Sequence, residues 1–263
     1  MNTSSRSFRR TAAPALLATL LLGAAASANA SDWTWSVTPY VWATDIGVDV
    51  TIDDRQIVDE TIAVEDLLED IDAIGQIHVE AQRGAHGVMF DIFDVRLSDD
   101  DSHIALPNPP GGEAILSSET GMTILELGGI YDPRGDQQGF SLLYGTRILQ
   151  QRADIDARFE IDPSTAVTRT YEVTDTLYDG LLGIRYIKSF SPRWTWQARV
   201  DASTGGTELT WNADSTVAYT FGKTGRYSIL AGYRYMVVDF DTDDQVDVDM
   251  TLSGFVTGLR FSF

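Results

Sequence analysis

In this sequence, segments with alternating polar and apolar residues carry charged side chains at every second position, on one face of the expected strands. These are the residues whose types and spacing could form ion pairs or an acid–base site. Six carboxylates and five arginines share this parity with Gln76 and His78: Glu80, Asp91, Glu126, Arg147, Asp179, Arg185, Arg199, Asp201, Asp214, Arg234 and Arg260. Moving a charge out of bulk water costs several kcal/mol unless a partner lies close. This nearly balanced set predicts an interlocked ionic network inside the fold, and the alternative is the lining of a narrow channel.

The three histidines of the chain are the candidates for acid–base catalysis. His86 falls in an expected turn, and His78 has the inward parity of the charged set. Only His103, beside Ser102 and the acidic run 99–101, falls in an expected external loop. A lone loop histidine next to aspartates is usually a solvated surface group. We therefore predict no catalytic residue and no enzyme, with a hydrolase acting at the external rim as the alternative.

The acidic stretch 241–249 is the candidate for a metal site, because oxygen ligands suit hard divalent cations such as calcium. It lacks the glycine and the terminal glutamate of an EF-hand loop, so solvated negative charge is the simpler interpretation and no metal site is predicted. A divalent cation held by acidic external loops is the alternative. The chain also has no nucleotide-binding glycine motif and no zinc-ligand cluster, so we expect no cofactor.

The first 30 residues have the features of a signal peptide. Arg6, Arg9 and Arg10 precede an apolar run over 15–26, and residues 28–30 form an A-x-A cleavage signal. We predict cleavage before Ser31 and one mature domain over 31–263. Removing three of the 19 basic residues and none of the 39 acidic ones gives a mature charge of 16 − 39 = −23. This charge argues against a nucleic-acid partner, and the absence of cysteine excludes disulfides and thiol chemistry.

Short alternating segments divided by turn residues follow from Trp33 onward and predict ten strands. The connections alternate between short ones, at 84–87, 132–138, 191–193 and 222–225, and mostly longer ones, at 44–73, 98–120, 153–175 and 241–249. This rhythm is typical of a closed antiparallel transmembrane β-barrel with short periplasmic turns and longer external loops. Eight or twelve strands are the alternatives. Pro39 predicts a bulge or strand end, because it lacks a ladder donor.

Residues 64–71 have the spacing of a short amphipathic helix within the first long loop. So short a helix is marginal alone and must pack against another part of the fold. It would either plug the barrel mouth or lie on the surface.

The final strand carries apolar side chains on one face: Phe255, Leu259, Phe261 and Phe263. The same parity in other strands is rich in aromatic residues, such as Phe140, Tyr178, Trp194 and Tyr227, which predicts a lipid-facing surface with aromatic girdles at strand ends.

Several segments resemble a largely uncharacterised family of Gram-negative outer-membrane β-barrel proteins. They are the runs 179–186 (DGLLGIRY), 231–235 (AGYRY) and 258–263 (GLRFSF), with the opening run 39–42. The resemblance implies an outer-membrane location, contact with lipid and lipopolysaccharide, and insertion by the barrel-assembly machinery with the last strand as assembly signal. It implies no activity. We therefore expect a structural or envelope-stabilising barrel with a largely filled lumen, with a narrow porin or a rim hydrolase as alternatives.

Overall fold

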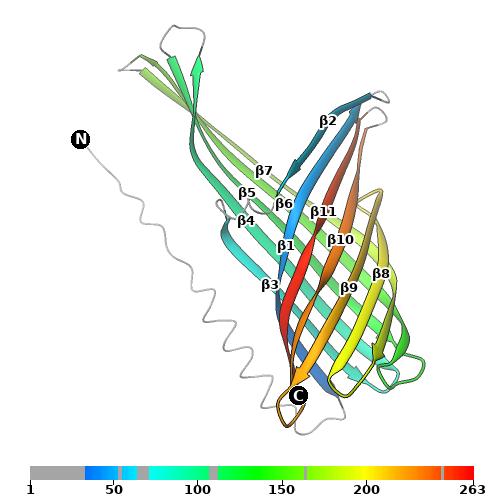
Figure 1. The fold of residues 1–263 in the computed structure, drawn as a ribbon. Helices are drawn as coiled ribbons and strands as arrows, with labels where there is room; N and C mark the ends of the chain where they lie inside the picture. Colours follow the sequence, from blue (N-terminus) through cyan, green and yellow to red (C-terminus); the bar gives the residue numbers. More distant parts are fainter. Residues whose placement is uncertain (1–32, 53–54, 64–70, 107–111, 163–164, 244–245) are drawn as a thin grey trace.

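The chain forms a closed antiparallel β-barrel whose strands are inclined to the barrel axis (Figure 1). The computed structural model describes residues 33–52, 55–63, 71–106, 112–162, 165–243 and 246–263. The strands are β1 (Thr34–Ile52), β2 (Arg55–Ile62), β3 (Ile71–Arg83), β4 (His86–Leu106), β5 (Gly112–Tyr131), β6 (Gly139–Asp162), β7 (Thr165–Ser189), β8 (Trp194–Gly205), β9 (Leu209–Phe221), β10 (Tyr227–Asp243) and β11 (Val246–Ser262). Among the residues that the structure describes, no helix has the length and hydrophobicity needed to cross a membrane.

Ten of these strands make the barrel wall, which confirms the predicted architecture and strand number. β1 pairs with both β3 and β11, so the ladder closes, while β2 folds back only on the far part of β1. The β1–β3 ladder ends at the pair Pro39–Ile77. β1 itself runs through Pro39 and keeps one register with β11 on both sides of it, so the expected bulge or strand end is absent.

The registers fix how far the strands tilt. Partner residues can be followed from Ser36 of β1 around the wall through β3 and then each strand to β11. This path returns to β1 at Val48, a displacement of 48 − 36 = 12 residues. A ten-stranded barrel with this stagger has strands inclined by roughly 40° to its axis and an interior that side chains can fill.

The predicted external loops are mostly strand. β4 and β5 pair as far as Leu106–Gly112, and β6 and β7 pair without a break from Gly139–Ile187 to Glu160–Ala166. His103 therefore lies in β4 opposite Ile115 and not in a loop. Extension of the hairpins gives the backbone groups between neighbouring strands ladder partners, and the run 165–173 is rich in strand-forming residues. The proposed helix at 64–71 lies outside the described residues, except that Ile71 begins β3.

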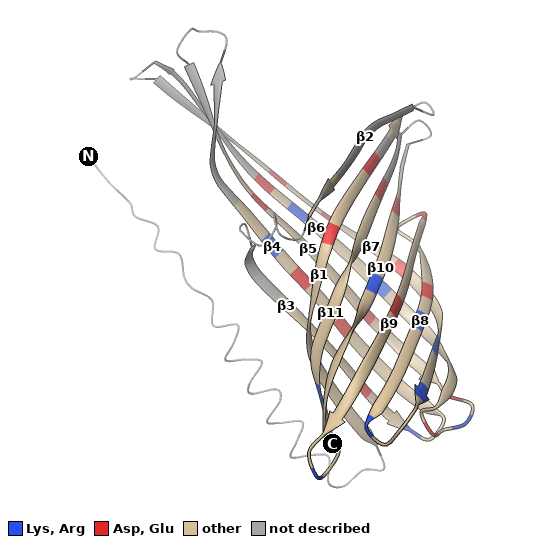
Figure 2. Cartoon of the chain, viewed as in Figure 1, with Lys and Arg blue, Asp and Glu red and all other residues tan. Residues whose placement is uncertain are grey.

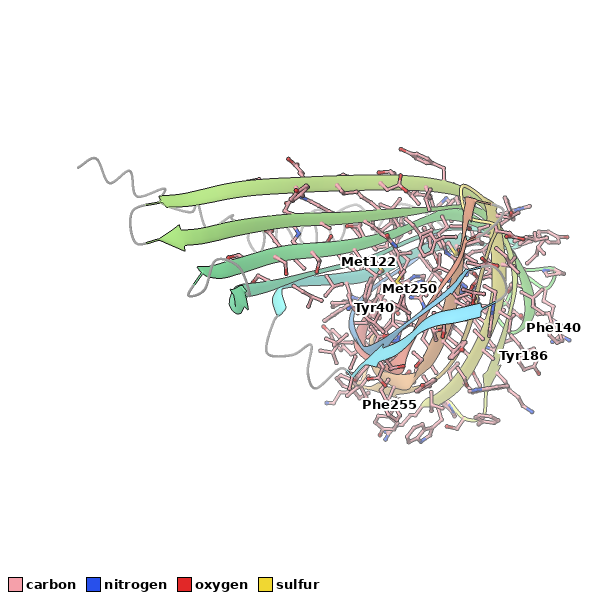
Figure 3. All side chains as sticks on the ribbon, turned by 90° about the horizontal axis from the view of Figure 1, so that it is seen from above. Tyr40, Met122, Phe140, Tyr186, Met250 and Phe255 are labelled. Carbon is pink, nitrogen blue, oxygen red and sulfur yellow. The ribbon has the colours of Figure 1, made fainter. Side chains whose placement is uncertain are left out.

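Alternation separates two faces, as the sequence predicted. Phe140, Tyr186 and Phe255 point away from the barrel in Figure 3, whereas Met122 and Met250 lie within it. Large apolar side chains exposed on the outer face include Phe255 at 74%, Tyr178 at 64% and Leu182 at 61%. An apolar belt of this extent requires contact with something other than water.

The outer face changes character toward the long hairpins. On β4, β5 and β6 the outward residues Ile92, Leu125 and Ile148 are followed, two positions further, by Asp94, Thr123 and Gln150. Thr123 donates a hydrogen bond to Asp94 at 2.6 Å. These positions mark the edge of the apolar belt.

Closure at the short-turn end depends on the last residue. The backbones of Phe263 and Trp35 exchange two hydrogen bonds, of 2.9 and 3.3 Å. We expect deletion of Phe263 to remove a ring whose burial contributes at most about 1.5–3 kcal/mol, and so to leave refolded protein in detergent stable. Insertion in cells should fall much further, because closure joins strands at the greatest sequence separation.

Membrane-inserted protein, quantified by its heat-dependent shift on a detergent gel, measures this effect. Ser262→Ala is the control, and it should insert normally. Equal insertion of the two variants would show that the terminal aromatic does not direct assembly.

Candidate functional site

The structure places the eleven charged residues at inward-facing positions of nine strands, β3 to β11, and it buries most of them. The fully buried members are Glu126, Arg147, Asp179, Arg185 and Asp201, each at most 3% exposed. Asp91, Arg199 and Arg234 are also buried, while Glu80, Asp214 and Arg260 are partly buried. The barrel interior is therefore the candidate site, and its chemistry is that of charges held away from bulk water.

Arg147 of β6 is the centre of the larger group of contacts. Its guanidinium donates to Glu126 Oε1 from Nε at 3.1 Å and from Nη2 at 2.6 Å. It also donates to Asp201 Oδ1 at 2.5 Å and to Ser203 Oγ at 3.0 Å. With no exposed surface of its own, Arg147 depends on these acceptors for its solvation, since an unpaired buried charge is strongly unfavourable.

Glu126 and Asp201 each join a second arginine. Arg199 Nη2 donates to Glu126 Oε2 at 2.7 Å, and Arg199 Nε lies 2.6 Å from Asp201 Oδ2. Arg234 Nη2 approaches Glu126 Oε1 at 3.6 Å and its Nε donates to Asn212 Oδ1 at 2.7 Å. Two carboxylates thus serve three guanidinium groups from β6, β8 and β10, which ties opposite parts of the wall together.

A second group surrounds His78 of β3. Its Nδ1 lies 2.9 Å from Asp91 Oδ2 and its Nε2 lies 2.9 Å from Glu80 Oε1. Tyr40 donates to Asp91 at 2.8 Å, and Arg185 pairs with Glu80. Because both ring nitrogens face carboxylate oxygens, a doubly protonated imidazolium satisfies both contacts. His78 would then supply a sixth cation and balance the six carboxylates.

Asp179 has a different role from the one its parity suggested. Its carboxylate accepts hydrogen bonds from Ser203 Oγ, Thr207 Oγ1 and the backbone N–H groups of Gly206 and Thr207, at 2.7–3.0 Å. It therefore holds the tight β8–β9 connection and touches the network through Ser203, which also accepts from Arg147. The β8–β9 connection is short, whereas the other hairpins at the same end of the barrel are long.

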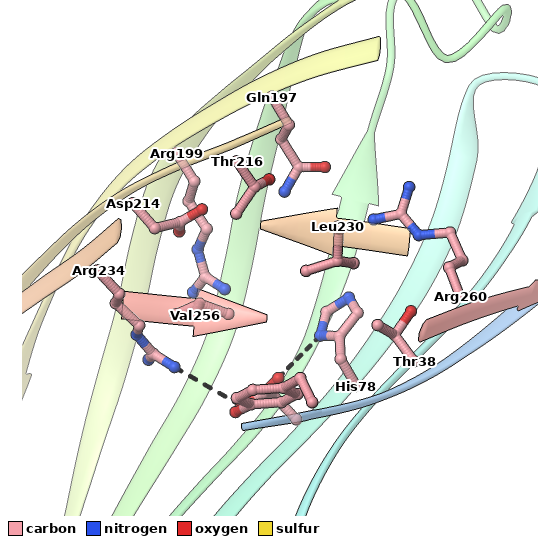
Figure 4. A pocket seen from close by; sticks show the side chains of 12 residues that line it. Thr38, His78, Gln197, Arg199, Asp214, Thr216, Leu230, Arg234, Val256 and Arg260 are labelled. Atoms are coloured by element: carbon pink, nitrogen blue, oxygen red, sulfur yellow. Dashed lines mark hydrogen bonds and ion pairs between the residues drawn. The ribbon is translucent and has the colours of Figure 1, made fainter. Parts of the chain in front are cut away.

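The free volume among these groups is divided between two small cavities, and one of them, of about 100 Å³, lies toward the short turns beside Glu80, Gln197 and Arg260. The other cavity, of about 90 Å³, lies between Tyr40, His78, Arg199, Arg234 and Arg260 (Figure 4). At about 30 Å³ per water molecule, it has room for roughly three waters. Asp214 also lines it, between its cross-strand neighbours Arg199 and Arg234.

An apolar layer is stacked on the ionic one, toward the long hairpins. Each member lies two positions from a residue of the ionic layer on the same strand, on the side of the long hairpins. The pairs are Trp42 and Tyr40, Phe93 and Asp91, Ile124 and Glu126, Leu149 and Arg147, and Met236 and Arg234. Each member of the apolar layer is at most 2% exposed. The Trp42 and Phe93 rings meet edge to face at 5.3 Å, and the Arg234 guanidinium lies 4.5 Å from the Trp42 ring.

Sequence reasoning missed this layer because it assigned the inward parity to polar residues along whole strands. The signal was present, since the sets 40, 42, 46, 48 and 91, 93, 95, 97 turn apolar part-way along the strand while their outward neighbours turn polar. A second buried apolar group, Met89, Ile130, Leu143 and Leu181, lines the wall nearer the short turns.

The described residues do not form a site for the other two candidate activities, metal binding and hydrolysis at the rim. Within the described ranges there is no group of three or more histidine, aspartate or glutamate side chains that could hold a metal ion. The side chains of His103, Ser102 and residues 241–248 lie outside the described part, so the rim hydrolase and the cation site stay predictions. His86 sits at the β3–β4 turn with its ring 5.5 Å from that of Tyr131.

Similar solved structures are outer-membrane β-barrels. The outer membrane protease OmpT of Escherichia coli is 8% identical, with a TM-score of 0.45 and coverage of 89% of this chain and 98% of that chain. The translocator domain of the autotransporter NalP of Neisseria meningitidis is 13% identical, with a TM-score of 0.42 and coverage of 96% and 97%. The attachment invasion locus protein Ail of Yersinia pestis is 11% identical, with a TM-score of 0.28 and coverage of 88% and 98%.

No protein-family model matches the chain, and no curated protein matches it in sequence. The resemblance based on the run 258–263 therefore gains no support from family models. The structural similarities concern the fold alone.

Removal of the central guanidinium tests the network. Arg147→Ala leaves Glu126 and Asp201 without their closest donor, and breaking a buried pair commonly costs about 3–5 kcal/mol. We expect a clearly lower unfolding temperature in detergent. Arg193→Ala is the control, because Arg193 is exposed in the β7–β8 turn and, in the contacts described, its side chain donates only to Tyr219. Its loss should cost no more than about 1 kcal/mol. Equal shifts would mean that water already solvates Arg147.

Proposed function

We propose that this chain is an integral outer-membrane barrel with a filled, non-conducting lumen and a structural or envelope-stabilising role. The observation that carries this proposal is the filling of the barrel interior by two stacked layers. Arg147, Glu126 and Asp201 lie in the ionic layer, and Trp42 and Phe93 lie in the apolar layer, all with 2% exposure or less. An ion crossing this section would have to displace paired charges and then pass an apolar layer, and both steps are costly.

The outer surface supports a membrane location. Its apolar belt carries aromatic pairs near the short turns, such as Trp194 with Tyr219 at 4.9 Å and Phe140 with Tyr186 at 4.7 Å, as expected of an interfacial girdle. Charged residues are distributed unevenly between the two ends (Figure 2). Basic residues gather at the short turns: Arg83, Arg134, Lys188, Arg193, Lys223 and Arg226.

This asymmetry favours one orientation. Basic groups at the short turns would face the phospholipid leaflet on the periplasmic side, and the acidic long hairpins would extend outside the cell. Export would use the predicted signal peptide over 1–30, and insertion would use the barrel-assembly machinery, with Phe255, Leu259, Phe261 and Phe263 as the assembly signal. Contact with lipopolysaccharide would involve divalent cations that bridge its phosphates to the acidic end.

A narrow channel is the second candidate, because the 90 Å³ cavity is lined by charged groups. Planar-bilayer recordings separate the two functions. We expect the purified full chain to give no conductance steps, whereas Trp42→Ala combined with Arg147→Ala, which removes material from both layers, should produce small steps. Arg193→Ala, outside the lumen, should stay silent. Regular steps from the unaltered chain would establish the channel and contradict the filled lumen.

A further inference from the structure

Beyond the apolar layer, a cavity of about 400 Å³ is lined by residues of β1 and β11 and of β4 to β7. We define the apolar cup by seven side chains that line it: Ile46 and Val48 of β1, Val95 and Leu97 of β4, Met122 of β5, Val173 of β7 and Met250 of β11. Met122 and Met250 lie inside the barrel in the view from above (Figure 3). The buried layer of Trp42 and Phe93 lies beneath the cup, so the space ends at a closed apolar floor.

In the wall around the apolar cup, the polar and apolar faces are exchanged relative to the apolar belt below it. Its outer side carries Asp94, Arg96, Thr123, Gln150 and Arg152, which together line a polar pocket on the outer surface. Polar groups thus face outward and apolar groups face inward, as in a water-soluble protein. This part of the barrel therefore stands beyond the membrane edge, and the apolar cup belongs to the cell-surface end.

An empty apolar cup would leave hydrophobic side chains against water. Val173 keeps 63% of its surface exposed, although its position on β7 faces the interior. Concave, mainly apolar pockets of 300–1,000 Å³ are the usual form of small-molecule sites. The closed ladder and the two buried layers lie below this height, so an apolar lining here is not needed to close the barrel.

The charges at the rim select the kind of ligand. Asp175 is the acidic residue of the lining, and a carboxylate repels anions. Arg152 is the basic residue of the same lining and also reaches the polar pocket on the outer surface. It donates to Asp154 at 2.8 Å and approaches Glu172 at 3.5 Å, so its charge is already matched. The whole chain carries a formal charge of −20, which disfavours anionic amphiphiles further.

We propose that the apolar cup binds an uncharged hydrophobic small molecule at the cell surface. A 150 Å³ apolar cavity holds benzene, so 400 Å³ accommodates roughly 12–16 carbon atoms. The two methionines suit such a ligand, because their flexible, polarisable side chains adapt to varied shapes. This site goes beyond the proposed function and requires no conducting lumen.

The test uses the full chain in phosphatidylcholine nanodiscs and the uncharged fluorophore N-phenyl-1-naphthylamine, whose emission rises in apolar surroundings. Empty nanodiscs correct for partition into lipid. We expect a saturable signal from the protein that dodecanol displaces and that dodecanoate displaces at least tenfold less well. Absence of a saturable signal would overturn the proposal, and equal displacement by dodecanoate would overturn the uncharged ligand class.

Two neighbouring substitutions locate the site. Val173→Asp places a charge in the apolar cup at an exposed position that tolerates it, and it should weaken binding at least tenfold. Thr174→Asp adds the same charge on the opposite face of β7 and should leave binding unchanged. Val48→Phe, which fills the cup without adding charge, should also weaken binding. Each variant is first checked for its heat-dependent gel shift. Equal binding by all three and the unaltered chain would overturn the assignment to the cup.

Discussion

The burial of Arg147 between Glu126 and Asp201 is the constraint on which the rest of the structure depends. A guanidinium without exposed surface needs acceptors in fixed places, and these come from strands separated along the chain. The stagger of 48 − 36 = 12 residues around the wall brings them to one height. A slip of one residue in any of these strands would turn the charges outward and the apolar belt inward, so the network and the belt specify the same register.

The two inner layers complement each other. Without the apolar layer, water would enter the ionic layer and weaken its ion pairs. Without the ionic layer, nothing would fix the arginine side chains in one arrangement. Stacked together, Trp42 and Phe93 separate the ionic layer from the long-hairpin end of the barrel, and Arg234 bridges the layers through its contact with the Trp42 ring. Exclusion of water strengthens every electrostatic contact beneath it. The same apolar side chains form the floor of the cell-surface cup.

Much of this fold follows from the sequence, because alternation and turn residues are local signals. Turns such as 132–138 and outward aromatics such as Tyr178 and Phe255 could be assigned from them, as could the inward position of Arg147. Parity gives the face on which a residue lies but not its position along the barrel axis. The apolar layer, and the change of the outer face from apolar to polar at Asp94, were therefore not predicted. Charge-rich hairpin tips were taken for loops, because acidic composition conceals a ladder that continues. The hydrogen bonds of Asp179 could not be predicted, because their donors lie in the β8–β9 connection, far from Asp179 in the sequence.

The central claim is that Arg147 and Glu126 act as one buried, water-excluded unit. A double-mutant cycle tests it most directly, with the unfolding free energies of Arg147→Ala, Glu126→Ala and the double variant compared with that of the unaltered chain in lipid. The account predicts a coupling free energy of about 2–3 kcal/mol, near the upper end for residues in direct contact. Additive effects, with coupling below about 0.5 kcal/mol, would show that the lumen solvates each charge separately and would contradict a filled interior.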